Sequence, residues 1–372
     1  MSEAADFRLT PLAFSQLEGW ERDDPRPLLT AMQACRRHIE DIKPYKTGSL
    51  GVKPEELAAA FAEAPRGSDV TADQARRYFE AVFQPFQIEP MASGRGFVTA
   101  FYEPEVSVSD RADSEFRYPF YRQPDDLVEV DETHAPEGWD PGIRFGRRTA
   151  EGIELHPDRR RIDEGCLQGL GLEIAYARSK VDVFFAHVQG AARLVFPDGR
   201  QSRITYAAKS GHAFSPIGKL LIDRGEIARD EISMQAIRAW LAAHPDRVDA
   251  VLWHNRSYIF FREAAVEDRL LGPIAAAKVP LVAGRSLAVD RMIHTFGSPF
   301  FIRSDTITHM DDGAPFARLM LALDTGTAIV GPARGDIFTG SGEAAGLMAG
   351  AVRNTADFTI LIPRTAAGRY GG

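Results

Sequence analysis

The sequence has too few cysteines for a disulfide framework and too little positive charge for a nucleic-acid-binding surface. Only two cysteines, Cys35 and Cys166, occur among 372 residues, and they form neither a CxxC pair nor a zinc-binding spacing. We expect two separate, at least half-buried thiols, with a single long-range disulfide as the less favoured alternative. Acidic residues outnumber basic ones by 52 to 44, which gives a net charge of −8 and argues against nucleic acid as a partner.

Long apolar runs and clustered histidines are also absent. No stretch approaches the ~18 apolar residues of a membrane-spanning helix, so we expect no membrane span. The nine histidines contain no HExxH or comparable pattern, so we predict no metal site and no other cofactor. Residues 1–6 have neither the basic start nor the apolar stretch of an export signal. We therefore expect either a cytoplasmic protein or one whose export signal is missing from this chain.

What is present is the composition of a folded protein, with helices at the start. Hydrophobic residues make up 44% and charged residues 26% of the chain, and its length favours about two domains of ~150 residues each. Apolar residues at helical spacing predict a helix over residues 27–42. Residues 54–64 predict a second helix that begins at Pro54, and Thr71 with Gln74 forms a capping box that opens a third, over 71–83.

The middle of the chain favours strands and loops. Residues 97–102 predict a strand, residues 105 to about 210 favour strands and loops, and residues 194–206 predict a hairpin. A charged stretch rich in proline and glycine, residues 125–165, is expected to be an exposed loop. Its basic run, Arg159 to Arg161, is expected to be solvated.

Helices return before the last strands. Residues 215–244 predict helices, one of which is capped by Ser233 and buries Trp240. From Tyr258 onward, short strands alternate with turns, interrupted by one small helix over 343–351. The fold class is therefore mainly β with helical segments (α+β).

Two local motifs suggest functions that the rest of the chain disfavours. Asp324 with Thr325 and Gly326 matches the active-site pattern of an aspartic protease, but that chemistry needs two such carboxylates sharing one proton, and the motif occurs once. Residues 340–346 imitate a dinucleotide-binding glycine motif, but only 26 residues follow it. That is too few for the parallel sheet such a site requires.

Three aspartates lie in turns at the ends of apolar strands in the last part of the chain: Asp290, Asp324 and Asp336. Each alone can be explained as a turn residue that accepts hydrogen bonds from its own backbone. Three together, on strands expected to share one barrel, favour a carboxylate site. Carboxyl groups with apolar neighbours raise one another's pKa, which keeps a general acid protonated near neutral pH.

At these residues the sequence resembles the lytic murein transglycosylase A family, and the resemblance spans nearly the whole chain. The matching stretches, in family order, are residues 14–20, 99–104, 118–121, 188–190, 215–226, 233–238, 284–291 and 324–350. The resemblance implies a double-psi β-barrel domain built from residues 1–104 and 241–372, with its three-aspartate part at about 281–364. A second β-barrel domain, residues 105–240, is inserted, and a groove between the two domains binds a glycan strand.

The same resemblance implies an enzyme that cleaves peptidoglycan glycan strands with a single acid–base residue. Asp336 matches the family's catalytic aspartate, and Asp324 and Asp290 match its two companions. Thr99, Tyr102 and Gln189 are implied as sugar contacts, although strand packing explains Tyr102 equally well. The alternative from another class is a peptidoglycan-binding protein without turnover.

Two departures from the family pattern affect groove shape rather than the carboxylates. Ala191 and Ala192 stand where the family usually has Ser-Gly, and Thr327 replaces a glycine after Asp324. The substrate implies a periplasmic or envelope location, with outer-membrane association as a further expectation. A monomer that joins complexes of cell-wall enzymes is expected.

Overall fold

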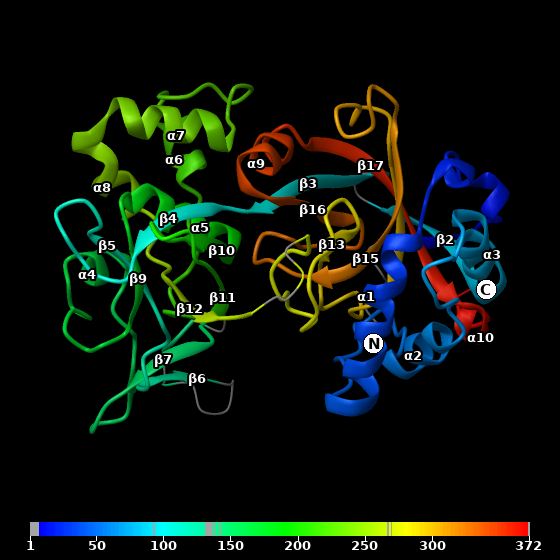
Figure 1. Cartoon of the computed structure of the whole chain (residues 1–372), viewed down its shortest axis with the longest axis horizontal. Helices are drawn as coiled ribbons and strands as arrows, with labels where there is room; N and C mark the ends of the chain where they lie inside the picture. Colours follow the sequence, from blue (N-terminus) through cyan, green and yellow to red (C-terminus); the bar gives the residue numbers. More distant parts are fainter. Residues whose placement is uncertain are drawn as a thin grey trace. The chain divides into compact units, whose positions relative to one another are not determined.

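A computed structural model describes residues 7–91, 94–130, 136, 138–140, 143–265, 268 and 270–370 (Figure 1). The chain divides into two compact units. The first takes the described residues of Met1–Tyr102, Val266–Gly340 and Ala344–Gly372, and the second those of Glu103–Ala265 and Ser341–Glu343. None of the described helices combines the length and the apolar character needed to cross a membrane.

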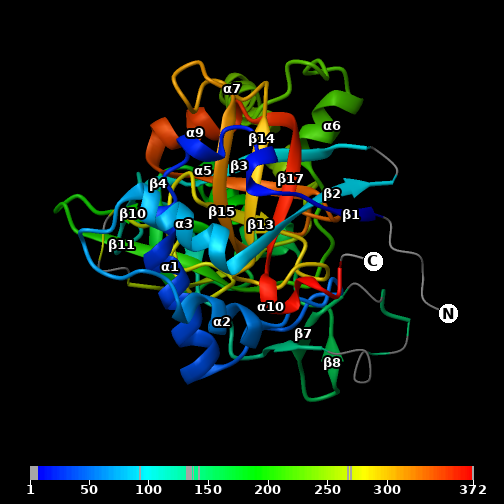
Figure 2. The same ribbon diagram turned by 90° about the vertical axis from the view of Figure 1, so that its right-hand side faces the viewer.

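The first unit is built on a sheet of eight strands. Their order is β1-β2-β17-β14-β15-β13-β16-β3, and β3 also pairs with β17. Figure 2 shows β13, β14, β15 and β17 running side by side. The strands span Phe7–Pro11 (β1), Phe83–Pro90 (β2), Gly96–Glu103 (β3), Ser286–Val289 (β13), Pro299–Ser304 (β14), Phe316–Asp324 (β15), Arg334–Ser341 (β16) and Arg353–Pro363 (β17).

Helices cover the sheet of this unit. They are α1 (Arg26–Arg37), α2 (Pro54–Ala62), α3 (Ala72–Val82), α9 (Gly342–Gly350) and α10 (Arg364–Ala367), with short helical turns at Phe14–Gln16, Trp20–Arg22 and His38–Ile42. The three predicted N-terminal helices are confirmed. In α1, Leu28, Met32 and Cys35 are buried at helical spacing. Thr71 caps α3 through the predicted box, accepting a 3.2 Å hydrogen bond from the Gln74 backbone N–H.

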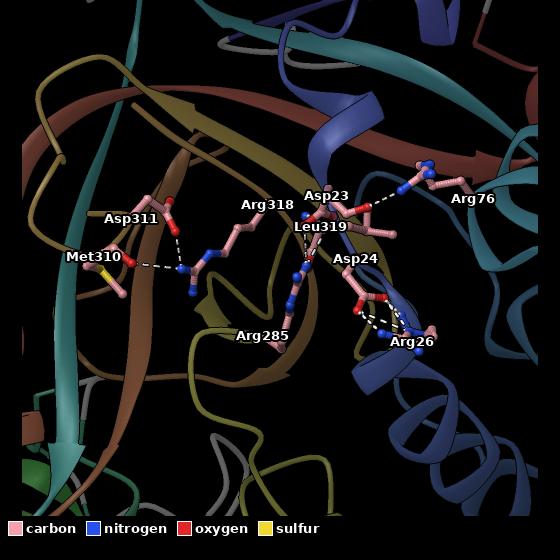
Figure 3. A network of polar contacts seen from close by, with 9 residues as sticks. All are labelled: Asp23, Asp24, Arg26, Arg76, Arg285, Met310, Asp311, Arg318 and Leu319. Carbon is pink, nitrogen blue, oxygen red and sulfur yellow. Dashed lines mark hydrogen bonds and ion pairs between the residues drawn. The ribbon is translucent and has the colours of Figure 1, made fainter. Parts of the chain in front are cut away.

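A buried ion pair joins the N-terminal segment to the sheet (Figure 3). The Asp23 carboxylate, 4% exposed, lies 2.7 Å from the Arg285 guanidinium. Its second oxygen accepts a 2.9 Å hydrogen bond from the Leu319 backbone N–H. Because β15 is apolar and almost wholly buried, this pair has little solvent near it and fixes the helices to the strand before Asp324.

The second unit has a six-stranded sheet and a separate three-stranded one. The strand orders are β12-β11-β10-β4-β9-β5 and β6-β7-β8. The predicted hairpin is confirmed as the antiparallel pair β10 and β11. The strands span Glu105–Ser109 (β4), Tyr118–Tyr121 (β5), Leu127–Glu129 (β6), Phe145–Arg148 (β7), Ile153–Glu154 (β8), Glu173–Ala177 (β9), Ala191–Val195 (β10), Gln201–Lys209 (β11) and Ile259–Glu263 (β12).

Four of the five helices described in the second unit, all except the first, share a small apolar core. The five helices are α4 (Arg159–Asp163), α5 (Lys180–Gln189), α6 (Ile217–Asp223), α7 (Met234–Ala243) and α8 (Val248–Leu252), with one short turn at Pro245–Arg247. The expected cap at Ser233 and the burial of Trp240 are both confirmed. Helix α5 lies in the stretch expected to hold only strands and loops, which corrects that prediction.

The expectation of an exposed loop over residues 125–165 is wrong for the segments that form β6, β7, β8 and α4. Residues 131–135, 137 and 141–142 lie outside the described residues. Arg159 of its basic run is 2% exposed rather than solvated. Its guanidinium donates to the carbonyls of Asn255 and Ser257 at 3.0 and 2.7 Å, which replaces the water it loses. Cys35 and Cys166 are both free thiols; Cys35 is buried as expected, but Cys166 is exposed.

Candidate active site

Two of the three predicted aspartates lie in one row of the first unit's sheet. Asp324 ends β15 and Asp336 is the third residue of β16, and both pair with Ala288 of the strand between them, β13. Directly paired residues project to the same face of a sheet. Two strand spacings of about 4.8 Å place their Cα atoms roughly 10 Å apart. The register therefore brings both carboxyl groups to one face.

The Asp336 carboxyl is held by the neighbouring strand β3. The Thr99 hydroxyl donates a hydrogen bond to Asp336 Oδ1, and Arg334 Nη2 donates to the same hydroxyl oxygen at 2.7 Å. Burial raises the pKa of Asp336, while the hydrogen bond from Thr99 and the positive charge of Arg334 oppose that rise. The net direction is upward, as a general acid requires.

Asp324 is a second carboxyl with a raised pKa. Burial raises the pKa of Asp324 to about 6, and the nearby charge of Asp336 contributes to the rise. A backbone hydrogen bond from Ala276, 3.2 Å from Asp324 Oδ1, acts in the opposite direction, as does the charge of Lys278. The charge of Asp336 therefore acts on the pKa of Asp324, and the reverse effect of Asp324 on the pKa of Asp336 stays a prediction.

Asp290 lies just after β13 and uses both carboxylate oxygens on backbone groups. Oδ1 accepts from the Met292 N–H and Oδ2 from the Gly331 N–H, each at 2.9 Å. The first bond closes a local turn, and the second reaches the loop that joins β15 to β16. These hydrogen bonds are those of a turn residue whose carboxylate accepts from backbone groups, which is the alternative explanation given for each aspartate.

His294 reinforces the contact between that turn and that loop. Its Nε2 lies 2.8 Å from the Pro332 carbonyl oxygen, and its ring packs edge-on against Phe300. The residue is 1% exposed, and Nδ1 has no hydrogen-bond partner. Burial lowers the pKa of His294 to about 4, so the ring is neutral near neutral pH. Asp290 and His294 lie in the same turn, and both hold the segment between Asp324 and Asp336 through hydrogen bonds.

The predicted sugar contacts lie in different surroundings. Thr99 contacts Asp336 directly. Tyr102, 8% exposed, packs against α9, where a Cβ on Gly346 would come within 2.8 Å of its ring. Packing therefore accounts for much of its burial, and Gly346 is needed for that approach. Gln189 ends α5 in the second unit, where Gly190 at φ 74° terminates the helix.

Arg334 is the residue of this site that sequence reasoning missed. It precedes Asp336 by two positions on β16, and side chains two apart on a strand share a face. That spacing is the signal that could have identified it.

Helix α9 follows β16 and begins within one residue of the expected position. Gly340 at φ 123° and Gly342 at φ 86° turn the strand into the helix.

Comparison with known proteins supports the division of the chain into two units. The family model described as MltA specific insert domain matches residues 97–262, and the 3D domain model matches residues 285–362. The chain is a mixed α+β protein with two sheet domains, and all three predicted aspartates fall in the region that matches the 3D domain model. The chain belongs to the lytic murein transglycosylase A family.

The matches to individual relatives cover different shares of each relative's length. Membrane-bound lytic murein transglycosylase A of Escherichia coli K12 is 34% identical over 260 residues, which is 68% of this chain and 61% of that protein. The crystal structure of a membrane-bound lytic murein transglycosylase from Agrobacterium tumefaciens is 63% identical, covers 98% of this chain and 99% of that one, and has a TM-score of 0.92. E. coli MltA with bound chitohexaose is 26% identical, with coverages of 96% and 94% and a TM-score of 0.64.

Proposed function

We propose that this protein is a lytic transglycosylase that cleaves the β-1,4 bond between N-acetylmuramic acid and N-acetylglucosamine in peptidoglycan. The observation that carries the proposal is the Asp336 carboxyl. It has a raised pKa, accepts a hydrogen bond from Thr99 and lies in the region that matches the 3D domain. The name of the E. coli relative and the chitohexaose bound to E. coli MltA support a glycan substrate.

Asp336 would act first as acid and then as base. Protonated Asp336 gives its proton to the glycosidic oxygen as the C1–O bond breaks and the N-acetylglucosamine hydroxyl leaves. The resulting carboxylate takes the proton of the muramic C6 hydroxyl as that oxygen bonds to C1. The product is a 1,6-anhydro end, no water is consumed, and the acid is regenerated. This differs from glycosidases that use two carboxylates to add water.

The other predicted site residues have separate proposed roles. Asp324, paired with the same Ala288, places a negative charge near Asp336 that favours its protonated form and the positively charged, oxocarbenium-like transition state. Asp290 is proposed to support the site through the loop it holds. Thr99, Tyr102 and Gln189 are proposed sugar contacts. No metal or organic cofactor enters this scheme.

We further propose that each sheet domain is a closed barrel. In the first unit the pairings run from β17 through β14, β15, β13, β16 and β3 back to β17, which supports closure. In the second, a bridge between Arg122 and Phe261 brings the ends of the six-stranded sheet together. Double-psi topology in the first, and the division into residues 1–104 with 241–372 and an inserted 105–240, stay predictions.

The substrate sets the proposed location and partners. Peptidoglycan lies in the cell envelope, and the relatives' names describe membrane-bound enzymes. We propose that the chain acts there on glycan strands as a monomer, associated with the outer membrane and with other cell-wall enzymes.

The test is incubation of the protein with purified murein sacculi, followed by mass spectrometry of the released fragments. We expect 1,6-anhydromuramic ends. Reducing ends would instead indicate a hydrolase, and binding without release would indicate a peptidoglycan-binding protein; either result would contradict the proposal.

The Asp336→Asn variant should be inactive while folded, because acid–base assistance is worth roughly 10²–10⁴-fold and one group supplies it twice. Asp305→Asn, at an exposed carboxylate of the same unit, is the matched control and should retain activity. A folded Asp336→Asn variant with a tenth of normal activity would refute the assignment.

A further inference from the structure

Thr99 engages one of the two oxygens of the Asp336 carboxyl, and Arg334 in turn contacts Thr99. Thr99 Oγ1 contacts Asp336 Oδ1, and Arg334 Nη2 lies 2.7 Å from the same Oγ1. Arg334 and Asp336 are two apart on β16, and Phe97 and Thr99 are two apart on β3. Because β3 and β16 are neighbours in the sheet, the two rows of side chains meet on one face.

The chemistry of the three groups fixes the direction of both hydrogen bonds. A guanidinium has donors only, so Thr99 must accept from Arg334. A hydroxyl with a lone pair used in this way still has its single proton to donate. That proton points to Asp336 Oδ1. Oδ1 is therefore an acceptor, and the nearby positive charge makes it the less favourable oxygen for a proton of its own.

Arg334 is itself held in place for this task. Its Nη1 donates to the Gly335 carbonyl, and its guanidinium lies over the Phe97 ring at 5.5 Å from the ring centre. Burial lowers the pKa of Arg334, while the charge of Asp336 opposes that change. The side chain is thus a fixed, partly buried cation rather than a mobile surface group.

We propose that Arg334 is a positioning residue which, acting through Thr99, keeps the catalytic proton on Oδ2 of Asp336. This inference rests on the proposed function and adds to it the choice of oxygen. The oxygen that delivers the proton must be the one not engaged by the protein, because a proton on Oδ1 would be directed at Thr99 rather than at the glycosidic oxygen. Without Arg334, the Thr99 hydroxyl is free to rotate and accept from Oδ1–H, and part of the acid population becomes unproductive.

The proposal predicts two separable kinetic effects for Arg334→Met. On the low-pH plateau, where Asp336 is protonated, kcat should fall roughly tenfold, the equivalent of about one net hydrogen bond, with little change in KM. The alkaline limb of the pH–rate profile should move to higher pH, because a cation that favours the ionised form has been removed. The negative charge proposed for Asp324 acts in the same direction.

The decisive experiment is a double-mutant cycle on plateau kcat, measured as release of anhydro-ended fragments from soluble glycan strands. We expect Thr99→Val and Arg334→Met each to lose roughly tenfold, and the double variant to lose no more than Thr99→Val alone, because Arg334 acts through the hydroxyl. Thr99→Ser, which keeps the hydroxyl, should restore near-normal kcat. Independent losses that multiply to about a hundredfold, or a plateau kcat of Arg334→Met within twofold of wild type, would overturn the proposal.

The matched control is Arg353→Gln. Arg353 is exposed on β17, opposite Thr99 in the register, so its loss removes a nearby cation without touching the hydroxyl, and plateau kcat should be unchanged. A tenfold loss in this control would show that charge alone matters and would refute the role given to Thr99. If wild type released no anhydro ends, the proposed function itself would fail; wild-type activity without the cycle's coupling would defeat only this inference.

Discussion

Asp324 and Asp336 are linked through Ala288, the residue with which both pair in the sheet. The shared partner sets the separation of their Cα atoms through the backbone pairing. Burial raises the pKa of both carboxyls, and two interacting acids titrate as a pair in two steps. One carboxyl can therefore be ionised while the other keeps its proton.

We expect Asp324→Asn to shift the alkaline limb of activity to lower pH. Removing the neighbouring negative charge favours ionisation of Asp336, and at roughly 10 Å the shift should be on the order of one pH unit. The amide oxygen can still accept from the Ala276 N–H, so the turn is preserved. A pH–rate profile with an unchanged limb and a near-normal rate would reduce Asp324 to a structural role.

For Asp290→Ala we expect a loss of stability rather than a shifted pH profile. Both carboxylate oxygens hold backbone N–H groups, and hydrogen bonds to charged groups are worth about 1.5–3 kcal/mol each. Urea unfolding should show a loss of roughly 3 kcal/mol, whereas Asp305→Ala, at an exposed site, should lose less than about 1 kcal/mol. A displaced alkaline limb with normal stability would instead assign Asp290 an electrostatic role.

Acid should weaken the fold through His294. Its pKa is about 4 in the folded chain and near 6.5 when unfolded. Stability from this group is therefore complete above pH 6.5 and is lost as pH falls toward 4. The loss approaches about 3 kcal/mol at the low end.

Chemical denaturation at pH 7 and pH 4.5 should consequently differ less for His294→Gln than for wild type. His309→Gln, which removes an exposed histidine of the same unit, serves as the control and should keep the wild-type difference. Equal differences for all three proteins would contradict the role of His294.

Breaking the Asp23–Arg285 pair should be costly, because it leaves a buried charge without its partner (Figure 3). We expect Asp23→Asn to lower the free energy of unfolding by about 3–5 kcal/mol. The adjacent Asp24→Asn is the matched control, since Asp24 binds Arg26 at the surface, and should cost less than about 1 kcal/mol. Similar losses for both variants would mean that burial adds nothing to the first pair.

Local features of the fold could be predicted from the sequence, whereas features set by distant packing could not. Helices α1 and α3 follow from apolar spacing and a capping box within a few residues. Helix α5 was missed because valine and phenylalanine favour strands, and its capping by Ser179 and its packing decide otherwise. The burial of Arg159 depends on carbonyls almost 100 positions away, which no local pattern reveals.

The candidate site shows the same limit. Apolar strands ending in aspartate identified Asp290, Asp324 and Asp336 as a group, and family resemblance added Thr99. The strand register decides which of them lie in one row, and it separates Asp290, which holds a turn, from the pair opposite Ala288. Arg334 was overlooked because an arginine near a strand end is unremarkable until its partner on β3 is known.

The hydrogen bond between Thr99 and Asp336 joins residues 237 positions apart, and this distance affects biogenesis. The strand that carries Thr99 pairs with β16 and with β17, both near the end of the chain. Contacts of such long range form late and slowly during folding. The ribosome has to synthesise the chain as far as Asp336 before the acid can meet the hydroxyl. A nascent chain that ends before β16 therefore holds only the Thr99 half of the candidate acid site.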